Sequence, residues 1–152
     1  MARFSVSLLF FALSIIPAIN ALSTAPPFWL RIVGQSQDPN GTPLYLTSTG
    51  STTRDKNAAA VCWNSPYGEL FCGDFSHAIG VPSNTDATVL KGCVAERCLT
   101  KQINIDSNTL ALDWSQANFW YSASTGSAWA TLRGAKAPTE DAVPATMLAT
   151  FG

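Results

Sequence analysis

The sequence QINIDSNTLALDWSQANFWYSASTGSAWATLR, which runs from Gln102 to Arg133, predicts two β-hairpins in succession. Its first half alternates apolar and polar residues with the period of two that is typical of half-buried strands. The polar run DSNT between these strands is typical of a turn, because its side chains can hydrogen-bond their own backbone. Pairing across this turn is expected to place Ile105 opposite Leu110 and Ile103 opposite Leu112.

The second hairpin follows directly along the chain. Phe119 to Ser122 is its expected first strand, STGS its turn, and Ala128 to Leu132 its second strand. Other short segments have the same alternating or β-rich character. They are Phe28–Val33, Leu44–Thr47, Ala58–Trp63, Glu69–Phe75 and Thr88–Leu90.

These short strands, separated by turn residues, predict an all-β fold. We expect a single antiparallel β-sandwich or β-barrel of about 8–10 short strands, stabilised by disulfides. Residues 47–60 are expected to form a surface loop and residues 77–86 an irregular segment, while Met147–Phe151 could be a last strand or a helix. No internal repeat of about 40 residues, which a three-fold architecture would need, is visible.

Residues 1–21 are predicted to be a cleaved secretory signal peptide. Arg3 precedes an apolar run from Val6 to Ile16, and small residues follow it. We expect cleavage after Ala21, with cleavage after Ser23 as the alternative. The apolar run is shorter than the roughly 20 residues that a membrane-spanning helix needs, which disfavours an anchor.

Removal of this leader would leave 131 of the 152 residues, enough for one domain. Residues 22–27 are expected to be an N-terminal tether and residues 28–152 a single β domain. The mature chain would carry eight Lys and Arg against ten Asp and Glu, a net charge of −2. The basic residues are scattered, so nucleic acid is not an expected partner. After cleavage, we also expect no association with a membrane.

Four cysteines, Cys62, Cys72, Cys93 and Cys98, predict two disulfides in an oxidising compartment. Three pairings are possible. We favour Cys62 with Cys72 and Cys93 with Cys98, because each pair is close in sequence and a predicted turn separates the first pair. Each disulfide would stabilise the fold by about 2–3 kcal/mol. Neither pair has the two-residue spacing of a zinc knuckle, so a metal site is disfavoured.

Asn40 is a candidate glycosylation site. It lies in the acceptor sequence Asn40-Gly41-Thr42, and Asn-Gly between two apolar strands is also a strong hairpin signal. The two roles are compatible because a turn tip is exposed. Pro43, directly after the acceptor, could lower its use.

The segment INIDSNTL at residues 103–110, followed by SAWA at 127–130, resembles small secreted fungal proteins of the PhiA cell-wall type. The opening FWL at residues 28–30 and LYL at 44–46 are similar to such chains as well. The resemblance covers about a third of the chain, and the cysteine placement departs from it. It implies an extracellular or wall-associated β protein, and no catalytic residue carries over.

His77 is the only histidine of the chain. A small hydrolase could use it with Ser76 and Asp74, but sequence neighbours on a strand point to opposite faces and no nucleophile elbow is present. A glycosidase needs two carboxylates roughly 5–10 Å apart. Asp106 and Asp113 could face each other only if their strands paired in another register, and Glu69 with Asp74 is a similarly poor pair. Asp106 is better explained by its turn. Charged residues make up only 12 % of the chain, which leaves few groups for a catalytic site. The sequence therefore predicts a non-enzyme without a cofactor or metal.

Aromatic residues gather between positions 114 and 129, and they are the strongest binding signal in the sequence. Trp120 should point away from Phe119 and Tyr121 on a strand, so one face would be core and the other partly exposed. Trp29, Trp120 and Tyr121 are the candidate ligand platform, for stacking on a sugar ring or a protein. The alternative is that most of these aromatics fill the core.

Three functions follow from these observations. The first is a structural or glycan-contacting protein at the cell wall or cell surface, with a cell-wall polysaccharide as partner. The second is a secreted, effector-like protein that binds a host or environmental protein through an exposed apolar patch. The third is a small secreted hydrolase that uses His77.

Overall fold

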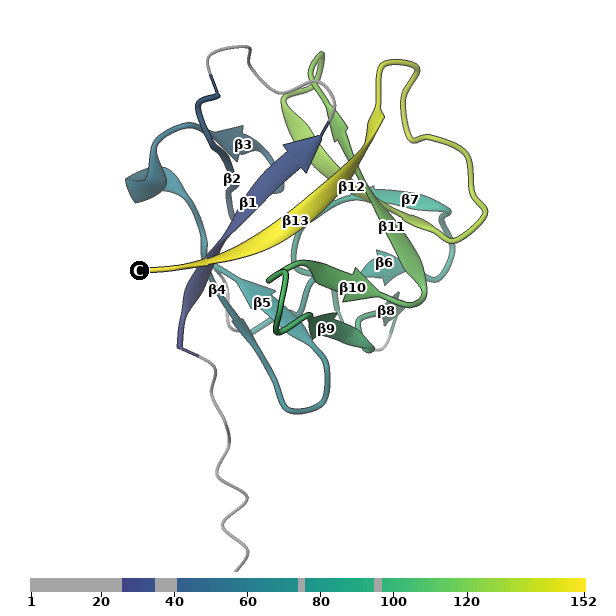
Figure 1. The fold of residues 1–152 in the computed structure, drawn as a ribbon. Helices are drawn as coiled ribbons and strands as arrows, with labels where there is room; N and C mark the ends of the chain where they lie inside the picture. The colour runs from purple at the N-terminus through teal and green to yellow at the C-terminus, as the bar shows by residue number, and fades with distance from the viewer. Residues whose placement is uncertain (1–25, 35–40, 74–75, 95–96) are drawn as a thin grey trace, which may run out of the picture.

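The structure, a computed structural model, describes residues 26–34, 41–73, 76–94 and 97–152. These residues contain no α-helix and form one large curled antiparallel sheet with two small two-stranded sheets beside it (Figure 1). The all-β fold expected from the sequence is therefore confirmed. The leader expected at residues 1–21, Asn40 and Asp74 lie outside the described residues.

Thirteen strands are present in these ranges, more than the about eight to ten expected. The strands are β1 (Phe28–Gly34), β2 (Leu44–Leu46), β3 (Thr52–Thr53), β4 (Val61–Asn64), β5 (Leu70–Cys72), β6 (Val81–Pro82), β7 (Ala87–Val89), β8 (Cys98–Leu99), β9 (Ile103–Ile105), β10 (Leu112–Trp114), β11 (Ala117–Ser122), β12 (Ser127–Leu132) and β13 (Val143–Phe151). The excess consists of two-residue strands: β3 lies in the expected loop 47–60, β6 in the expected irregular segment 77–86, and β8 at the second cysteine pair. A 3-10 turn, η1 (Lys56–Ala58), also lies within the expected loop 47–60.

The large sheet closes on itself next to β3. Its main path runs β3-β2-β1-β13-β11-β12-β7. Ser51, just before β3, pairs with Ser127 at the start of β12, and the N–H of Ala128 donates to the carbonyl of Gly50 at 2.9 Å. Gly50 has a φ of 83°, and a Cβ there would collide with the Val89 side chain. These contacts join β3, at one end of the path, to β12, the last strand but one, so the sheet closes into a barrel and is not an open sandwich.

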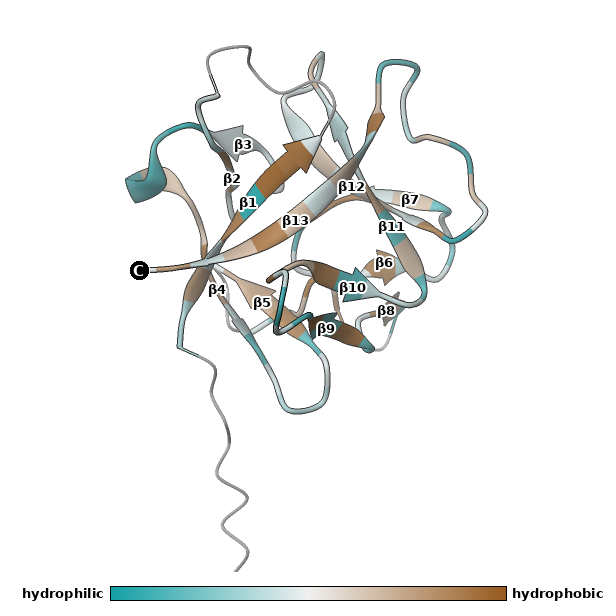
Figure 2. Ribbon diagram, in the orientation of Figure 1, coloured by the Kyte–Doolittle hydropathy of each residue, from teal (hydrophilic) through white to brown (hydrophobic). Residues whose placement is uncertain are grey.

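The wall of the barrel is built on β1 and β13, which lie side by side across the molecule in Figure 1. The two strands pair over seven residues, from Phe28 with Phe151 to Gly34 with Ala145. Figure 2 shows hydrophobic and hydrophilic positions alternating along β1. The inward side chains of β1 are at most 1 % exposed, namely Phe28, Leu30 and Ile32. The apolar C-terminal end therefore forms a strand, one of the two possibilities left open by the sequence.

The register of the first hairpin differs from the expected one by two residues. Leu112 pairs with Ile105, and Trp114 pairs with Ile103. Leu110 has a left-handed backbone, with a φ of 60°, and is 38 % exposed, so it belongs to the turn and not to the strand. A shift of two keeps every side chain on its expected face. The core face is therefore unchanged although the pairing prediction was wrong.

The second hairpin has the expected strands and turn. β11 and β12 pair over six residues, with Trp120 opposite Trp129 and Ser122 opposite Ser127. Phe119 is buried on the inner side, while Trp120 is on the opposite, outer side. No helix in the described part of the chain has the length and apolarity needed to cross a membrane.

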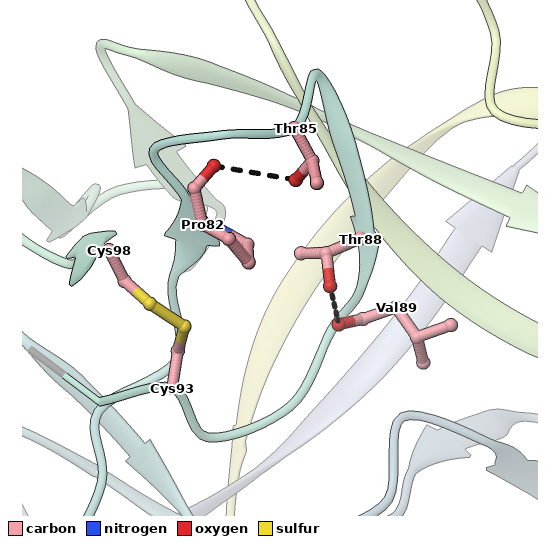
Figure 3. Close-up of a disulfide and its surroundings, with 6 residues drawn as sticks. All are labelled: Pro82, Thr85, Thr88, Val89, Cys93 and Cys98. Carbon is pink, nitrogen blue, oxygen red and sulfur yellow. Dashed lines mark hydrogen bonds between the residues drawn. A yellow bond between two sulfur atoms is a disulfide. The ribbon is translucent and has the colours of Figure 1, made fainter.

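Both disulfides join the cysteines that are close in sequence, as expected. Cys62 and Cys72 face each other across β4 and β5, with Cα atoms 4.1 Å apart, and both are buried. The Cα atoms of Cys93 and Cys98 are 6.2 Å apart. Figure 3 shows this second bridge beside Pro82, at the base of the segment that leads into β7. It ties β8 to the loop that precedes it.

Candidate functional site

The three residues expected to form a ligand platform do not lie together. Trp29 and Trp120 are on the outer face of the barrel, whereas Tyr121 packs against the core. Trp29 pairs with Thr150 and Trp120 with Pro144, both on β13. Six residues of extended strand separate these positions by roughly 20 Å, which is too far for the two indoles to stack on one sugar ring.

Trp29 is partly covered at its end of the barrel. The Lys56 ammonium lies 4.1 Å from the centroid of the Trp29 ring, the geometry of a cation–π contact. The ring also lies so close to Gly152 that a Cβ there would come within 2.9 Å of it. Since one ring face already contacts Lys56, Trp29 is less suited to stacking than Trp120.

Trp120 lines a cleft of about 430 Å3 between β10, β11 and β13. Its lining combines apolar and polar surface, and its polar side chains are Asp113, Asn118 and Arg133. An aromatic and aliphatic surface with a few polar groups is typical of small-molecule sites. The remaining lining residues are Leu112, Trp114, Ala117, Phe119, Pro144 and Ala145.

Hydrogen bonds fix the side chains of Trp120 and Arg133 in this cleft. The indole N–H of Trp120 donates to Thr131 Oγ at 2.8 Å, and Thr131 is fully buried. The Arg133 guanidinium donates to the backbone carbonyls of Ser115 and Trp114. It also lies 3.8 Å from Asp113, a contact that is exposed and therefore contributes little to stability. The cleft thus presents an oriented aromatic ring together with one carboxylate, one amide and one cation.

A second cleft, of about 500 Å3, lies around the start of β9. Its polar lining consists of Glu69, Thr100, Lys101, Gln102 and Gln116, with Cys98 and Leu99 completing it. Gln102 has a φ of 68°, a conformation that a side chain other than glycine rarely adopts. Its amide oxygen accepts a hydrogen bond from Ser115 Oγ at 2.6 Å.

Of the three residues considered for hydrolysis, the structure describes His77 and Ser76. His77 is exposed, and its backbone and Cβ pack against Gly92. Ser76 is exposed beside it, and Asp74 lies outside the described residues. No group of three or more His, Cys, Asp or Glu side chains in the described ranges could hold a metal ion.

Asp106 is occupied by its own turn. Its Oδ1 accepts hydrogen bonds from the backbone N–H groups of Thr109 and Asn108, at 2.7 and 2.9 Å, and from the Thr109 hydroxyl. These bonds, the Thr109 backbone first, lower the pKa of Asp106. Asp113 pairs with Asn104 and not with Asp106. A carboxylate with a lowered pKa is a poor general acid. The hydrogen bonds of Asp106 hold the turn of this hairpin.

The sequence analysis missed a polar cluster around Asp141, in the segment between β12 and β13. Its carboxylate accepts hydrogen bonds from the Ser124 N–H and hydroxyl, both at 2.9 Å, and from the Thr139 hydroxyl. The Ser122 hydroxyl donates to it as well. These bonds, the Ser124 backbone first, hold the pKa of Asp141 well below its usual range. No sequence signal indicated this cluster, since its members come from separate elements.

A second aromatic feature, on the β4–β5 hairpin, was also missed. Trp63 and Phe71 stack across the two strands, with ring centroids 4.6 Å apart and planes 9° from parallel. Tyr67 at the tip of the hairpin is 77 % exposed. The available signal was an aromatic residue directly inside each of Cys62 and Cys72.

Comparison with known proteins gives no match to this chain: none to a protein family, none to a curated protein and none to a solved structure.

Proposed function

We propose that this is a secreted, non-enzymatic protein that contacts glycans at the cell wall or cell surface. The observation that carries this proposal is the cleft around Trp120. An indole held by its N–H bond to Thr131 keeps a ring in place inside a cleft with an amide, a carboxylate and a guanidinium. Sugars have an apolar ring face and a polar rim of hydroxyls, and both kinds of group are available here.

Each polar residue of the cleft has a distinct role in this proposal. Asn118 lies two residues before Trp120 on β11, on the same outer face, and offers both a donor and an acceptor to sugar hydroxyls. Asp113 accepts and Arg133 donates. Because hydrogen bonds to the backbone hold Arg133, little rotamer entropy is lost when a ligand binds.

The location is part of the same proposal. Both cysteine pairs are bridged, which suits an oxidising compartment. The leader-like first 21 residues and the resemblance to wall proteins of the PhiA type suit secretion to the wall. N-glycosylation of Asn40 would also be consistent with secretion.

Pull-down on insoluble chitin, β-glucan and mannan tests the function. We expect retention on at least one of them. Trp120→Ala should raise the Kd for the matching soluble oligosaccharide by about tenfold or more, because an aromatic anchor of the cleft is removed. Trp29→Ala is the matched control and should bind like the wild type. Thermal unfolding of each variant checks that its fold is intact.

Absence of retention on all three polymers would exclude glycan contact through this cleft. An equal loss of affinity in the Trp29→Ala and Trp120→Ala variants would also contradict the proposal, since the two residues pair with opposite ends of β13. The milder Asn118→Ala keeps the indole in place. It should still weaken binding if Trp120→Ala proves unstable.

A second candidate function, binding to another protein, is favoured by the β4–β5 hairpin. Tyr67 is 77 % exposed and Val61 is 38 % exposed, and exposed aromatic residues are common interface anchors. In this case Tyr67→Ala would abolish capture of the partner while glycan retention stayed unchanged. The reverse result, loss only with Trp120→Ala, favours the glycan function.

A further inference from the structure

The second cleft, around Lys101 and Gln102, has no role in the function proposed above. Its volume of about 500 Å3 is comparable to that of the Trp120 cleft. Glu69, Lys101 and Gln116 give it charged and amide groups that suit a ligand rich in hydroxyls.

The two clefts meet at the two-residue turn Ser115–Gln116 between β10 and β11. The Ser115 hydroxyl donates to Gln102, which lines the second cleft, and the Ser115 carbonyl accepts from Arg133, which lines the Trp120 cleft. The backbone N–H of Arg133 also donates to the Gln116 carbonyl at 3.1 Å. One turn therefore holds a lining residue of each cleft.

The combined site is longer than one sugar ring. Gln116 lines the second cleft, and Asn118 and Trp120 line the first. From Gln116 to Trp120 the extended chain spans roughly 13 Å. A ligand that contacts both clefts is consequently a chain of several sugar units.

The charges of the two clefts are balanced. The first contains Asp113 and Arg133, and the second contains Glu69 and Lys101. Neither cleft has a net charge that would attract a polyanion or a polycation. This balance favours a neutral polysaccharide over a uronic acid polymer or a polyamine such as chitosan.

The backbone of the second cleft is held in an unfavourable conformation. Gln102 has a φ of 68°, and the next residue, Ile103, donates its N–H to the Gly68 carbonyl at 3.0 Å. Strained residues of this kind persist where the surrounding structure holds them, often at binding sites. The side-chain amide of Gln102 is oriented as well, because its oxygen accepts the hydrogen bond from the Ser115 hydroxyl.

We propose that the two clefts form one extended site for a neutral polysaccharide, with the Trp120 cleft holding one part of the chain and the Lys101–Gln116 cleft another. This inference rests on the glycan-contacting function proposed above.

Calorimetric titration with neutral oligosaccharides of increasing length, from monomer to hexamer, tests the extended site. The probes are the oligomers of N-acetylglucosamine, β-1,3-glucose and mannose. Affinity should rise with length until both clefts are filled. The double variant Lys101→Ala/Gln116→Ala should weaken the affinity for the hexamer by about three- to tenfold, which is the effect of losing one or two hydrogen bonds. Its affinity for the shortest oligomer that binds should stay the same as that of the wild type. Lys91→Ala, an exposed lysine outside both clefts, is the control.

Other outcomes would overturn the inference, and they separate it from the proposed function. An affinity independent of chain length, lost in Trp120→Ala and kept in the double variant, would leave the glycan function standing and remove the extended site. Equal weakening of short and long oligomers by the double variant would indicate one compact site instead. Binding of polygalacturonate or chitosan in preference to neutral chains would contradict the charge argument. No binding of any oligomer would overturn both proposals.

Discussion

Asp141 shows how one carboxylate can organise a segment through its hydrogen bonds. It holds the Ser124 backbone and three hydroxyls, including that of the fully buried Ser122, so it fastens the loop before β13 to the β11–β12 turn. Asp106 has the same role in the turn of the first hairpin. In both cases hydrogen bonding to the charged form lowers the carboxylate pKa.

These two lowered pKa values predict a loss of stability in acid. The unfolded carboxylates titrate near 3.8, and the folded ones titrate lower. Both groups therefore stabilise the fold above about pH 4, and this contribution is lost as the pH falls below that value. Urea denaturation followed between about pH 6 and pH 2 should show the decline. Asp141→Asn should be less stable at neutral pH and show a shallower decline.

Glu140→Gln, a change at the exposed neighbour of Asp141, is the matched control and should keep the wild-type pH dependence. If Asp141→Asn declines as steeply as the wild type, its carboxylate is not part of the acid response.

At the scale of elements, the β4–β5 hairpin combines two stabilising features. Its inner face carries the buried Cys62–Cys72 bridge, and its outer face carries the Trp63–Phe71 stack. Alternation along the strands places the two features on opposite faces. The hairpin is thus held from both sides, and this keeps Tyr67 at its exposed tip.

Removal of the first disulfide should destabilise the domain more than removal of the second. Cys62→Ala/Cys72→Ala opens a loop of sequence separation 10, whereas Cys93→Ala/Cys98→Ala opens one of separation 5. Loop-closure entropy gives a cost of about 2–3 kcal/mol for the former and a few tenths less for the latter. Because Cys62 and Cys72 are also buried in the core, their loss adds a packing term. The free energies of unfolding in urea compare the two variants, and an equal or reversed order would contradict this ranking.

At the scale of the whole molecule, the fold depends on pairing its first strand with its last strand. β1 near the start of the domain and β13 at its end pair over seven residues, and the core is packed against both. Closure beside Gly50 and Ser51 then completes the barrel. Contacts of such long sequence separation form late in folding, when most of the loop entropy has already been lost.

A chain that ends at Ala142 lacks β13 and should not fold. We expect neither the near-ultraviolet circular dichroism of packed aromatics nor a cooperative urea transition, because β1 loses its full-length partner and the core loses Met147 and Ala149. Removal of Gly152 alone, which follows β13, is the control and should leave the transition intact. A cooperative transition in the shortened chain would show that β13 is dispensable.

The sequence by itself determined the features that depend on neighbouring residues. Alternation in Phe28–Val33 and Phe119–Leu132 predicted which side chains face the core. The reason is that successive side chains of a strand point to opposite faces of the sheet. Close spacing predicted both cysteine pairs, since short loops bring their ends together easily. Trp120 was singled out as an outward-facing aromatic for the same local reason.

Only the tertiary structure decided which distant residues meet. The closed barrel, the pairing of β13 with β1 and the separation of Trp29 from Trp120 all follow from strand order, which no local pattern encodes. The two-residue shift at Leu110 arose because the turn extends into a residue that sequence alternation assigns to a strand. The two clefts likewise exist because residues far apart in the sequence line them together, such as Glu69 with Gln116 in one and Leu112 with Pro144 in the other. The residues of each strand determine which of its faces is apolar, and the packing of the whole chain determines which strands pair with each other.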